Sequence, residues 1–177
     1  MRHFTAALAA LAIALPGAAL AQPAKQDQRY FHDMAQANLA EVETSKLAEA
    51  RAQDGAVKSF ARHMVEDHGQ MLDEQRALAK KKDFAMPAQP AKEHQAALRR
   101  LEGAKGQEFD RLYMEQMVKD HEKSLALARE AAKKAKDPAL RSMAAAAAPK
   151  IDEHLKMARQ ISGAAAGATA PREKADK

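Results

Sequence analysis

The sequence predicts an all-α protein in which four long helices form a bundle of two antiparallel hairpins. Apolar residues recur every three or four positions in four segments, which is the spacing of one buried helix face. The 177 residues include only seven Gly and seven Pro, whereas the good helix formers Ala, Leu, Glu, Lys and Gln are abundant. No segment shows the alternation of apolar and polar residues that a half-buried strand requires.

A secretory signal peptide is predicted over residues 1–21. Arg2 is followed by the apolar stretch Leu8–Ala19 and by the small-residue cleavage motif Ala19-Leu20-Ala21. We therefore expect an exported, periplasmic and soluble protein with no integral membrane span after cleavage, because no later segment reaches the roughly 18–20 apolar residues that a span needs. The bundle domain is predicted over residues 22–162, and the Ala/Gly-rich, then charged, residues 163–177 are predicted to form a disordered tail.

The first predicted hairpin pairs Gln26–Ala52 with Ala56–Lys81. The apolar stripes of these segments contain Phe31, Met34, Val42 and Ala48 in the first, and Val57, Phe60, Met64, Met71 and Leu78 in the second. Asp54 stands immediately before the second segment, where an aspartate caps the free N–H groups of a helix start. A connection of only a few residues makes the two helices antiparallel neighbours.

The second predicted hairpin pairs Gln107–Ala135 with Pro138–Ile161. Asp137 is its N-cap, and Pro138 occupies the first helical position, where proline is favoured. The hairpins are joined by Asp83–Gly106, which contains two prolines and a predicted short helix around Ala91–Leu101. This linker is long enough for either a short-loop or a crossover topology.

The two hairpins resemble copies of each other. When the sequence is aligned with itself so that Asp27 falls on Asp110, Asp54 falls on Asp137, and a Tyr and a Met of the first and third helices also coincide. We call this alignment the hairpin register. A second register aligns the segments ending at His68 and His121. Helices rich in Ala match one another easily, so the sequence leaves the duplication as a hypothesis.

Four polar residues interrupt the apolar stripes at matching depths. His68, His121 and His154 lie on the stripes of the second, third and fourth long helices, and Glu41 lies at the edge of the first. Glu41 precedes Asp54 by almost the same distance along the chain as His68 follows it. His121 and His154 stand in the same relation to Asp137. In antiparallel hairpins these side chains approach one central level.

Three imidazoles and one carboxylate form a candidate first coordination shell for iron, zinc, copper or manganese. The candidate outer shell contains Asp67, Asp110, Tyr113, Asp120 and Glu153. Of the other histidines, His32, His63 and His94 are expected to be exposed. The alternative is a metal-free hydrogen-bond network that fixes the helix register. In that case the protein would be a structural or stress-related interaction module.

Other classes of function find little support in the sequence. The absence of Cys excludes disulfides and thiolate ligands. Because no nucleophile–base pair and no glycine-rich phosphate loop is recognisable, we assign no catalytic residue, no organic cofactor and no reaction. Lys and Arg are interleaved with Asp and Glu, so nucleic acid is not an expected partner. A homo-oligomer is compatible with the sequence, which identifies no protein partner.

Spaced motifs over about Gln26–Ile161 resemble an exported bacterial ferritin-like family, domain of unknown function 4142, whose members are often labelled predicted outer membrane proteins. The motifs are Glu41-Val42, Val57–Ala61, Met64–His68, Phe109-Asp110 with Tyr113, Met117–His121, and Pro149 followed by His154. The resemblance implies a ferritin-like four-helix architecture and no settled activity. Ferritin-like di-iron sites use Glu-x-x-His motifs, and none stands at the required places here, so a dinuclear iron centre is not expected.

Overall fold

The computed structural model describes residues 23–169, and every regular element in this range is a helix. The elements are α1 (Lys25–Arg51), α2 (Gly55–Lys82), α3 (Lys92–Gly103), α4 (Gly106–Lys134) and α5 (Pro138–Thr169). The predicted all-α class is confirmed, and α1, α2 and α4 begin and end within one residue of their predicted bounds. The helix α5 continues to Thr169, past the predicted domain end at 162. The predicted signal peptide and residues 170–177 lie outside the described residues.

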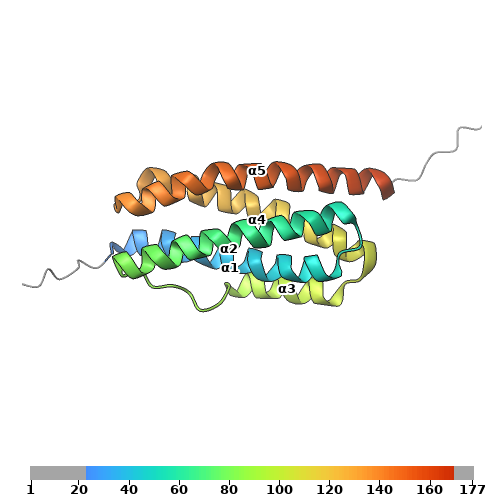
Figure 1. Cartoon of the computed structure of the whole chain (residues 1–177), viewed down its shortest axis with the longest axis horizontal. Coiled ribbons are helices and arrows are strands. Elements are labelled where there is room, and N and C mark those ends of the chain that lie inside the picture. The colour runs from blue at the N-terminus through green and yellow to red at the C-terminus, as the bar shows by residue number, and fades with distance from the viewer. Residues whose placement is uncertain (1–22, 170–177) are drawn as a thin grey trace, which may run out of the picture.

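The four long helices lie side by side, and α3 runs along their outside against α1 and α4 (Figure 1). Short loops at 52–54 and 135–137 join α1 to α2 and α4 to α5 as antiparallel hairpins. Across the hairpins, α1 packs on α4 and α2 packs on α5. The 83–105 segment returns along the length of the molecule, so that α2 and α4 run in the same direction (Figure 1). The topology that the sequence left open is therefore the crossover one.

Two residues with positive φ mark the ends of this crossover. Asp83 follows α2 in the left-handed conformation, with a φ of 57°, which stops the helix after three lysines. Gly106 begins α4 with a φ of 61°, and a side chain added there would also meet Gln53. A glycine suits this position because it adopts positive φ without steric cost.

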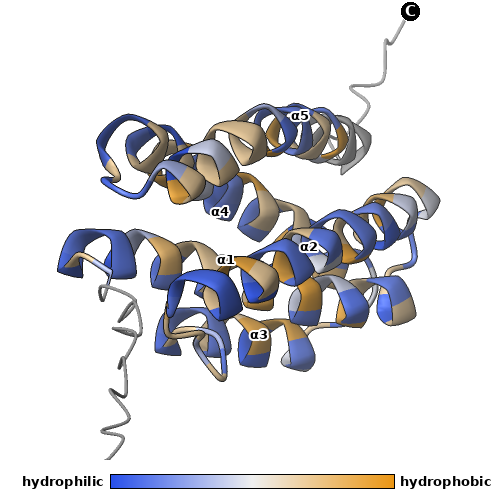
Figure 2. Ribbon diagram, turned by 60° about the vertical axis from the view of Figure 1, so that its left-hand side comes forward, coloured by the Kyte–Doolittle hydropathy of each residue, from blue (hydrophilic) through white to orange (hydrophobic). Residues whose placement is uncertain are grey.

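Buried apolar side chains form three clusters between the helices, two of them towards the ends of the molecule. Hydrophobic and hydrophilic residues alternate along each helix ribbon in Figure 2. One cluster, around Phe60 and Phe109, joins the end of α1 to the starts of α2 and α4. At the opposite end, Phe31 stacks on Phe84 with ring centroids 4.7 Å apart. The buried histidines lie along the helices between these clusters. None of the described helices is apolar enough over sufficient length to cross a membrane.

Aspartates cap the helices that begin after the two short loops. Asp54 accepts hydrogen bonds from the backbone N–H groups of Ala56 and Val57, at 2.7 and 3.1 Å. Asp137 does the same for Ala139 and Leu140, at 2.8 and 3.0 Å. Both predicted N-caps are therefore present, and each satisfies two of the donors that a helix start leaves free.

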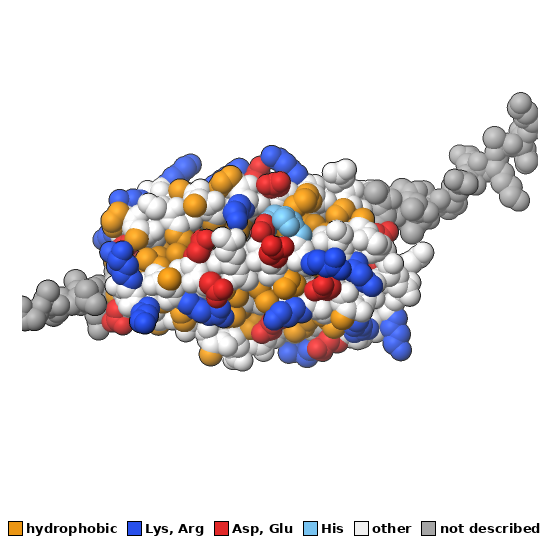
Figure 3. Space-filling model, in the orientation of Figure 1, with side chains coloured by type: hydrophobic (Ala, Val, Ile, Leu, Met, Phe, Trp, Pro, Cys, Tyr) orange, Lys and Arg blue, Asp and Glu red, His pale blue; other side chains and the backbone are white. Residues whose placement is uncertain are grey.

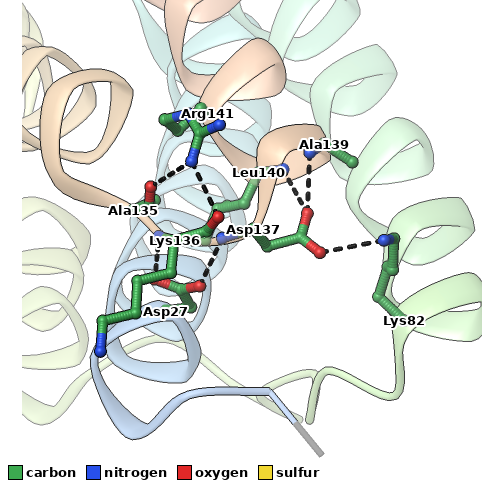
Figure 4. A network of polar contacts seen from close by, with 8 residues as sticks. All are labelled: Asp27, Lys82, Ala135, Lys136, Asp137, Ala139, Leu140 and Arg141. Carbon is green, nitrogen blue, oxygen red and sulfur yellow. Dashed lines mark hydrogen bonds and ion pairs between the residues drawn. The ribbon is translucent and has the colours of Figure 1, made fainter. Parts of the chain in front are cut away.

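Each hairpin also holds the loop of the other. Asp27, near the start of α1, accepts hydrogen bonds from the backbone N–H groups of Lys136 and Asp137, at 2.8 and 2.7 Å (Figure 4). Asp110, near the start of α4, accepts from those of Gln53 and Asp54, the shortest at 2.8 Å. The hairpin register, which pairs Asp27 with Asp110 in sequence, thus relates two equivalent contacts. This reciprocity supports the duplication hypothesis.

We expect Asp27→Ala to lower the free energy of unfolding by about 1–3 kcal/mol, because it leaves two backbone donors without their charged acceptor. Asp110→Ala should have a similar effect at the other loop. Asp73→Ala is the control, since the Asp73 side chain is 76% exposed and, within residues 23–169, forms an ion pair only with Arg76 on its own helix. Urea unfolding of the three variants checks the expectation, and equal stability of Asp27→Ala and Asp73→Ala would contradict it.

Candidate metal centre

Three buried histidines from three helices meet between the two apolar clusters. His68 on α2, His121 on α4 and His154 on α5 are each at most 1% exposed. One ring nitrogen from each lies within 4.8 Å of those of the other two. The Nε2 atoms of His68 and His121 are 3.4 Å apart. We call these three residues the His triad.

Hydrogen bonds at the outer nitrogens determine which nitrogen of His68 and His121 carries the proton. His68 Nδ1 donates to Asn38 Oδ1 at 2.8 Å, and the amide of Asn38 is oriented by donating its own N–H to Gln75 Oε1 at 3.0 Å. His121 Nδ1 donates to the carbonyl oxygen of Met117 at 2.8 Å. A neutral imidazole with its proton on Nδ1 has its lone pair on Nε2. The two Nε2 lone pairs therefore face each other.

His154 is held through its other nitrogen. Its Nε2 donates to Asp67 Oδ2 at 2.8 Å, whereas its Nδ1 is buried without a hydrogen-bond partner among the described residues. A carboxylate behind a histidine, as Asp67 stands behind His154, is the arrangement that orients metal-bound imidazoles and raises their basicity. We infer that each ring of the triad keeps one unprotonated nitrogen, which is the form in which histidine binds metal ions.

The environment of the triad favours the neutral rings. Burial lowers the pKa of His68 well below its ordinary value, and the neighbouring histidines lower it further. Burial lowers the pKa of His121 to about 4. The pKa of His154 is also lowered by burial, although its hydrogen bond to Asp67 opposes the change. At neutral pH all three rings are therefore uncharged and have lone pairs free for a cation.

Glu41 lies beside the triad, on the outer side of His121. Its Oε1 is 3.7 Å from His121 Nδ1, the nitrogen that faces away from His68. The residue is 3% exposed, and its Oε2 has no hydrogen-bond partner among the described residues. Burial, and secondarily the charge of Asp120, raise the pKa of Glu41 well above its ordinary value. The structure thus places this carboxyl group next to the triad but behind one of its rings.

The candidate outer-shell residues are spread over different parts of the molecule. Asp67 bonds to the triad, whereas Asp120 accepts from Gln116 Nε2 at 2.6 Å and lies 3.8 Å from His94 Nδ1. Asp110 holds the loop after α1. The Tyr113 hydroxyl is 2.9 Å from Ser45 Oγ, and Glu153 is exposed.

Sequence reasoning did not assign roles to Asn38 and His63. Asn38 is the partner of His68, and the hairpin register places it on His121. His63 Nε2 lies 3.4 Å from Asp67 Oδ2. The i, i+4 spacing of these two residues on one helix could have predicted this contact from the sequence. We expected His94 to be exposed, but it is half-buried. Its ring, on α3, faces Asp120 on α4.

We expect the free energy of unfolding of the chelator-treated protein to fall as the pH is lowered from about 6.5 to about 4. In this range the histidines of the unfolded chain take up protons that the buried rings do not. The free energy of unfolding therefore falls by up to about 1.4 kcal/mol per pH unit for each ring. His121→Leu removes one such ring, so its stability should depend less steeply on pH, while Glu41, which acts in the opposite direction, is present in both proteins.

Urea unfolding at several pH values measures the two slopes. His32→Leu is the matched control, because that side chain is 40% exposed and lies outside the triad, so its curve should run parallel to that of the wild type. A His121→Leu curve as steep as that of the wild type would contradict the expectation.

Comparison with known proteins gives one family and several similar folds. A family model described as "Domain of unknown function (DUF4142)" matches residues 12–161. A search of curated proteins found no match. The matched range contains α1 to α4, most of α5 and the complete His triad.

Solved structures with similar folds include two DUF305 proteins. The one from Streptomyces coelicolor has a TM-score of 0.69 and 13% identity, covering 79% of this chain and 92% of its own. The fragment from Deinococcus radiodurans has a TM-score of 0.71 and 13% identity, covering 81% and 99%. CopM in its Cu(II)-bound form has a TM-score of 0.66 and 18% identity, covering 77% and 95%. At these identities the likeness shows the fold alone.

Proposed function

The chain belongs to the DUF4142 family of domains of unknown function, and from this premise we propose that it binds a transition metal ion at the His triad in order to store, buffer or redox-cycle that ion. The observation that carries the proposal is the convergence of three buried, neutral imidazoles whose outer nitrogens are already engaged. A polar group buried without a partner costs roughly 1–3 kcal/mol. A cation shared by the three lone pairs would remove that cost.

The ligand set favours copper, zinc or iron over manganese. Imidazole nitrogens suit copper, zinc and iron, whereas carboxylate oxygens suit manganese, and only imidazoles face the centre of the triad. CopM, one of the structural neighbours, has been crystallised with Cu(II), Cu(I) and Ag. We propose Cu(I) or Cu(II) as the ion and place zinc next.

Glu41 belongs to the same proposal as a group that acts through His121. Its Oε1 lies 3.7 Å from His121 Nδ1, beyond hydrogen-bond distance, and that nitrogen donates its proton to the Met117 carbonyl. When a cation draws electron density from the ring, a carboxylate near the opposite nitrogen stabilises the resulting charge. The proposed site therefore consists of His68, His121 and His154 as ligands, with Glu41, Asp67 and Asn38 behind them.

We further propose that the protein is an exported ferritin-like four-helix bundle with a mononuclear metal site at the His triad. Four long helices with a single crossover agree with the ferritin-like arrangement. The neighbour from Streptomyces coelicolor is described as secreted, which supports export. The described site contains one carboxylate behind each of two histidines, unlike the bridging carboxylates of di-iron proteins.

A metal-free structural module is the less supported function. Such a network stabilises a core only when its members are satisfied, and His154 Nδ1 and Glu41 Oε2 have no hydrogen-bond partner among the described residues. The two hypotheses differ in what metal does to stability, because an ion that binds only the folded state raises the unfolding temperature.

We expect the wild type to bind one copper ion tightly and the His68→Ala/His121→Ala double variant to bind it at least about a hundredfold more weakly, as two of three ligands are lost. Competition with a chromophoric chelator measures the affinity for Cu(I), Cu(II) and zinc, and circular dichroism shows whether the variant remains helical. Equal affinities of the wild type and a folded double variant would remove the proposal.

Asn38→Leu should weaken copper binding by about 10–100-fold, because the proton of His68 Nδ1 loses its acceptor and the ring its orientation. Ser45→Ala is the matched control, since Ser45 is fully buried on the same helix and bonds to Tyr113 instead. The same chelator competition measures both variants. Unchanged affinity in Asn38→Leu would mean that the amide does not orient the ligand.

A further inference from the structure

We propose a second metal site at the surface, formed by His63, Asp67 and the outer nitrogen of His154, where an ion binds first on its way to the His triad. The inference rests on the proposed function, since it concerns how the same ion reaches the same three ligands. It adds two residues, His63 and Asp67, as ligands in their own right.

The geometry brings three donor atoms together. His63 Nε2 and His154 Nε2 lie 3.4 and 2.8 Å from Asp67 Oδ2, and one ligand atom from each of the three residues lies within 4.8 Å of the others. The two imidazoles stand edge to face, with ring centroids 5.4 Å apart. Two imidazoles and one carboxylate are a ligand set that zinc and copper accept. We call this group the outer site.

Exposure falls stepwise from solvent to the triad along these residues. The side chain of His63 is 46% exposed, that of Asp67 is 19% exposed, and that of His154 is 1% exposed. On the face drawn in Figure 3, a histidine side chain reaches the surface with acidic side chains beside it. A cation in solution is therefore met first by an accessible imidazole and a carboxylate whose charge attracts it.

The partners of the other two histidines of the triad are more deeply buried than Asp67. Behind His68 lie Asn38 and Gln75, which are 8% and 2% exposed. Behind His121 lie the Met117 carbonyl and Glu41, both in the interior. Asp67, the partner of the outer nitrogen of His154, is itself 3.4 Å from the exposed imidazole of His63.

His154 links the two sites because it presents one nitrogen to each. A neutral imidazole has a lone pair on only one nitrogen at a time, so this ring serves the outer site or the triad, but not both. An ion at the outer site takes the Nε2 lone pair while the ring proton is on Nδ1. With an ion at the triad, Nδ1 would have released its proton and Nε2 would have taken one up from solvent on the side of Asp67, which accepts its hydrogen bond as in the structure.

The test compares the rate of copper uptake with the affinity at equilibrium. In rapid mixing of the full mature protein with Cu(II) at pH 7, His63→Leu should slow filling of the triad by roughly tenfold or more, as expected for loss of one of three first-contact ligands. Its equilibrium affinity should stay within about twofold of the wild type, because the triad and its hydrogen bonds are intact. His63→Gln should behave like His63→Leu.

His32→Leu is the matched control, because His32 has a similarly exposed side chain, 40% exposed, and also lies near an aspartate, at 3.8 Å. Its uptake rate should equal that of the wild type. Tight binding by His63→Leu with an unchanged uptake rate would overturn the outer site and leave the proposed function standing. Failure of the wild type itself to bind copper would overturn both.

Discussion

The arrangement of the interior depends on how three imidazoles can be buried without charge. Each ring has one nitrogen bonded to a fixed acceptor, namely the Asn38 amide, the Met117 carbonyl or the Asp67 carboxylate. Each acceptor fixes the proton on the outer nitrogen of its ring, so the lone pair is on the inner nitrogen, which faces the other two rings. Apolar clusters lie on both sides of these rings along the helices, and the three imidazoles are at most 1% exposed. In such surroundings a cation competes with few other partners for the lone pairs.

Sequence patterns were sufficient for the helices because each signal was local. The bounds of α1, α2 and α4 follow from apolar periodicity and from the capping residues Asp54 and Asp137. The meeting of His68, His121 and His154 was also predictable, since equal distances from two hairpin loops give equal depths. The topology was not predictable, because the linker length allowed both solutions. In the observed topology Asp110 contacts the loop at 53–54, which is far from it in sequence.

Sequence spacing also could not predict from which side a neighbouring residue approaches a histidine ring. Glu41 lies at the same level along the bundle as the three histidines, yet its carboxyl group is behind His121. The position of a residue along a helix does not fix the direction in which its side chain points. Asp110 and Tyr113 illustrate the opposite limit, since both share a helix face with His121 but lie about two to three turns nearer the start of α4, where they contact the loop after α1 and Ser45. Asn38 orients His68 through a hydrogen bond, although nothing in its sequence surroundings indicated that role.

Asp27 bonds to the loop of the second hairpin, and Asp110 bonds to the loop of the first. The two contacts are arranged as in an isologous interface, in which equivalent residues of two subunits contact equivalent surfaces of each other. Two identical hairpins meeting about a twofold axis would make both contacts at once. They would also be forced to carry the same side chain at both equivalent positions near the axis. A single continuous chain is free of that restriction, so the position of His121 can supply a ring while its counterpart Asn38 supplies an amide. Joining the halves thus permits an odd number of histidines at a centre that symmetry would otherwise fill in pairs.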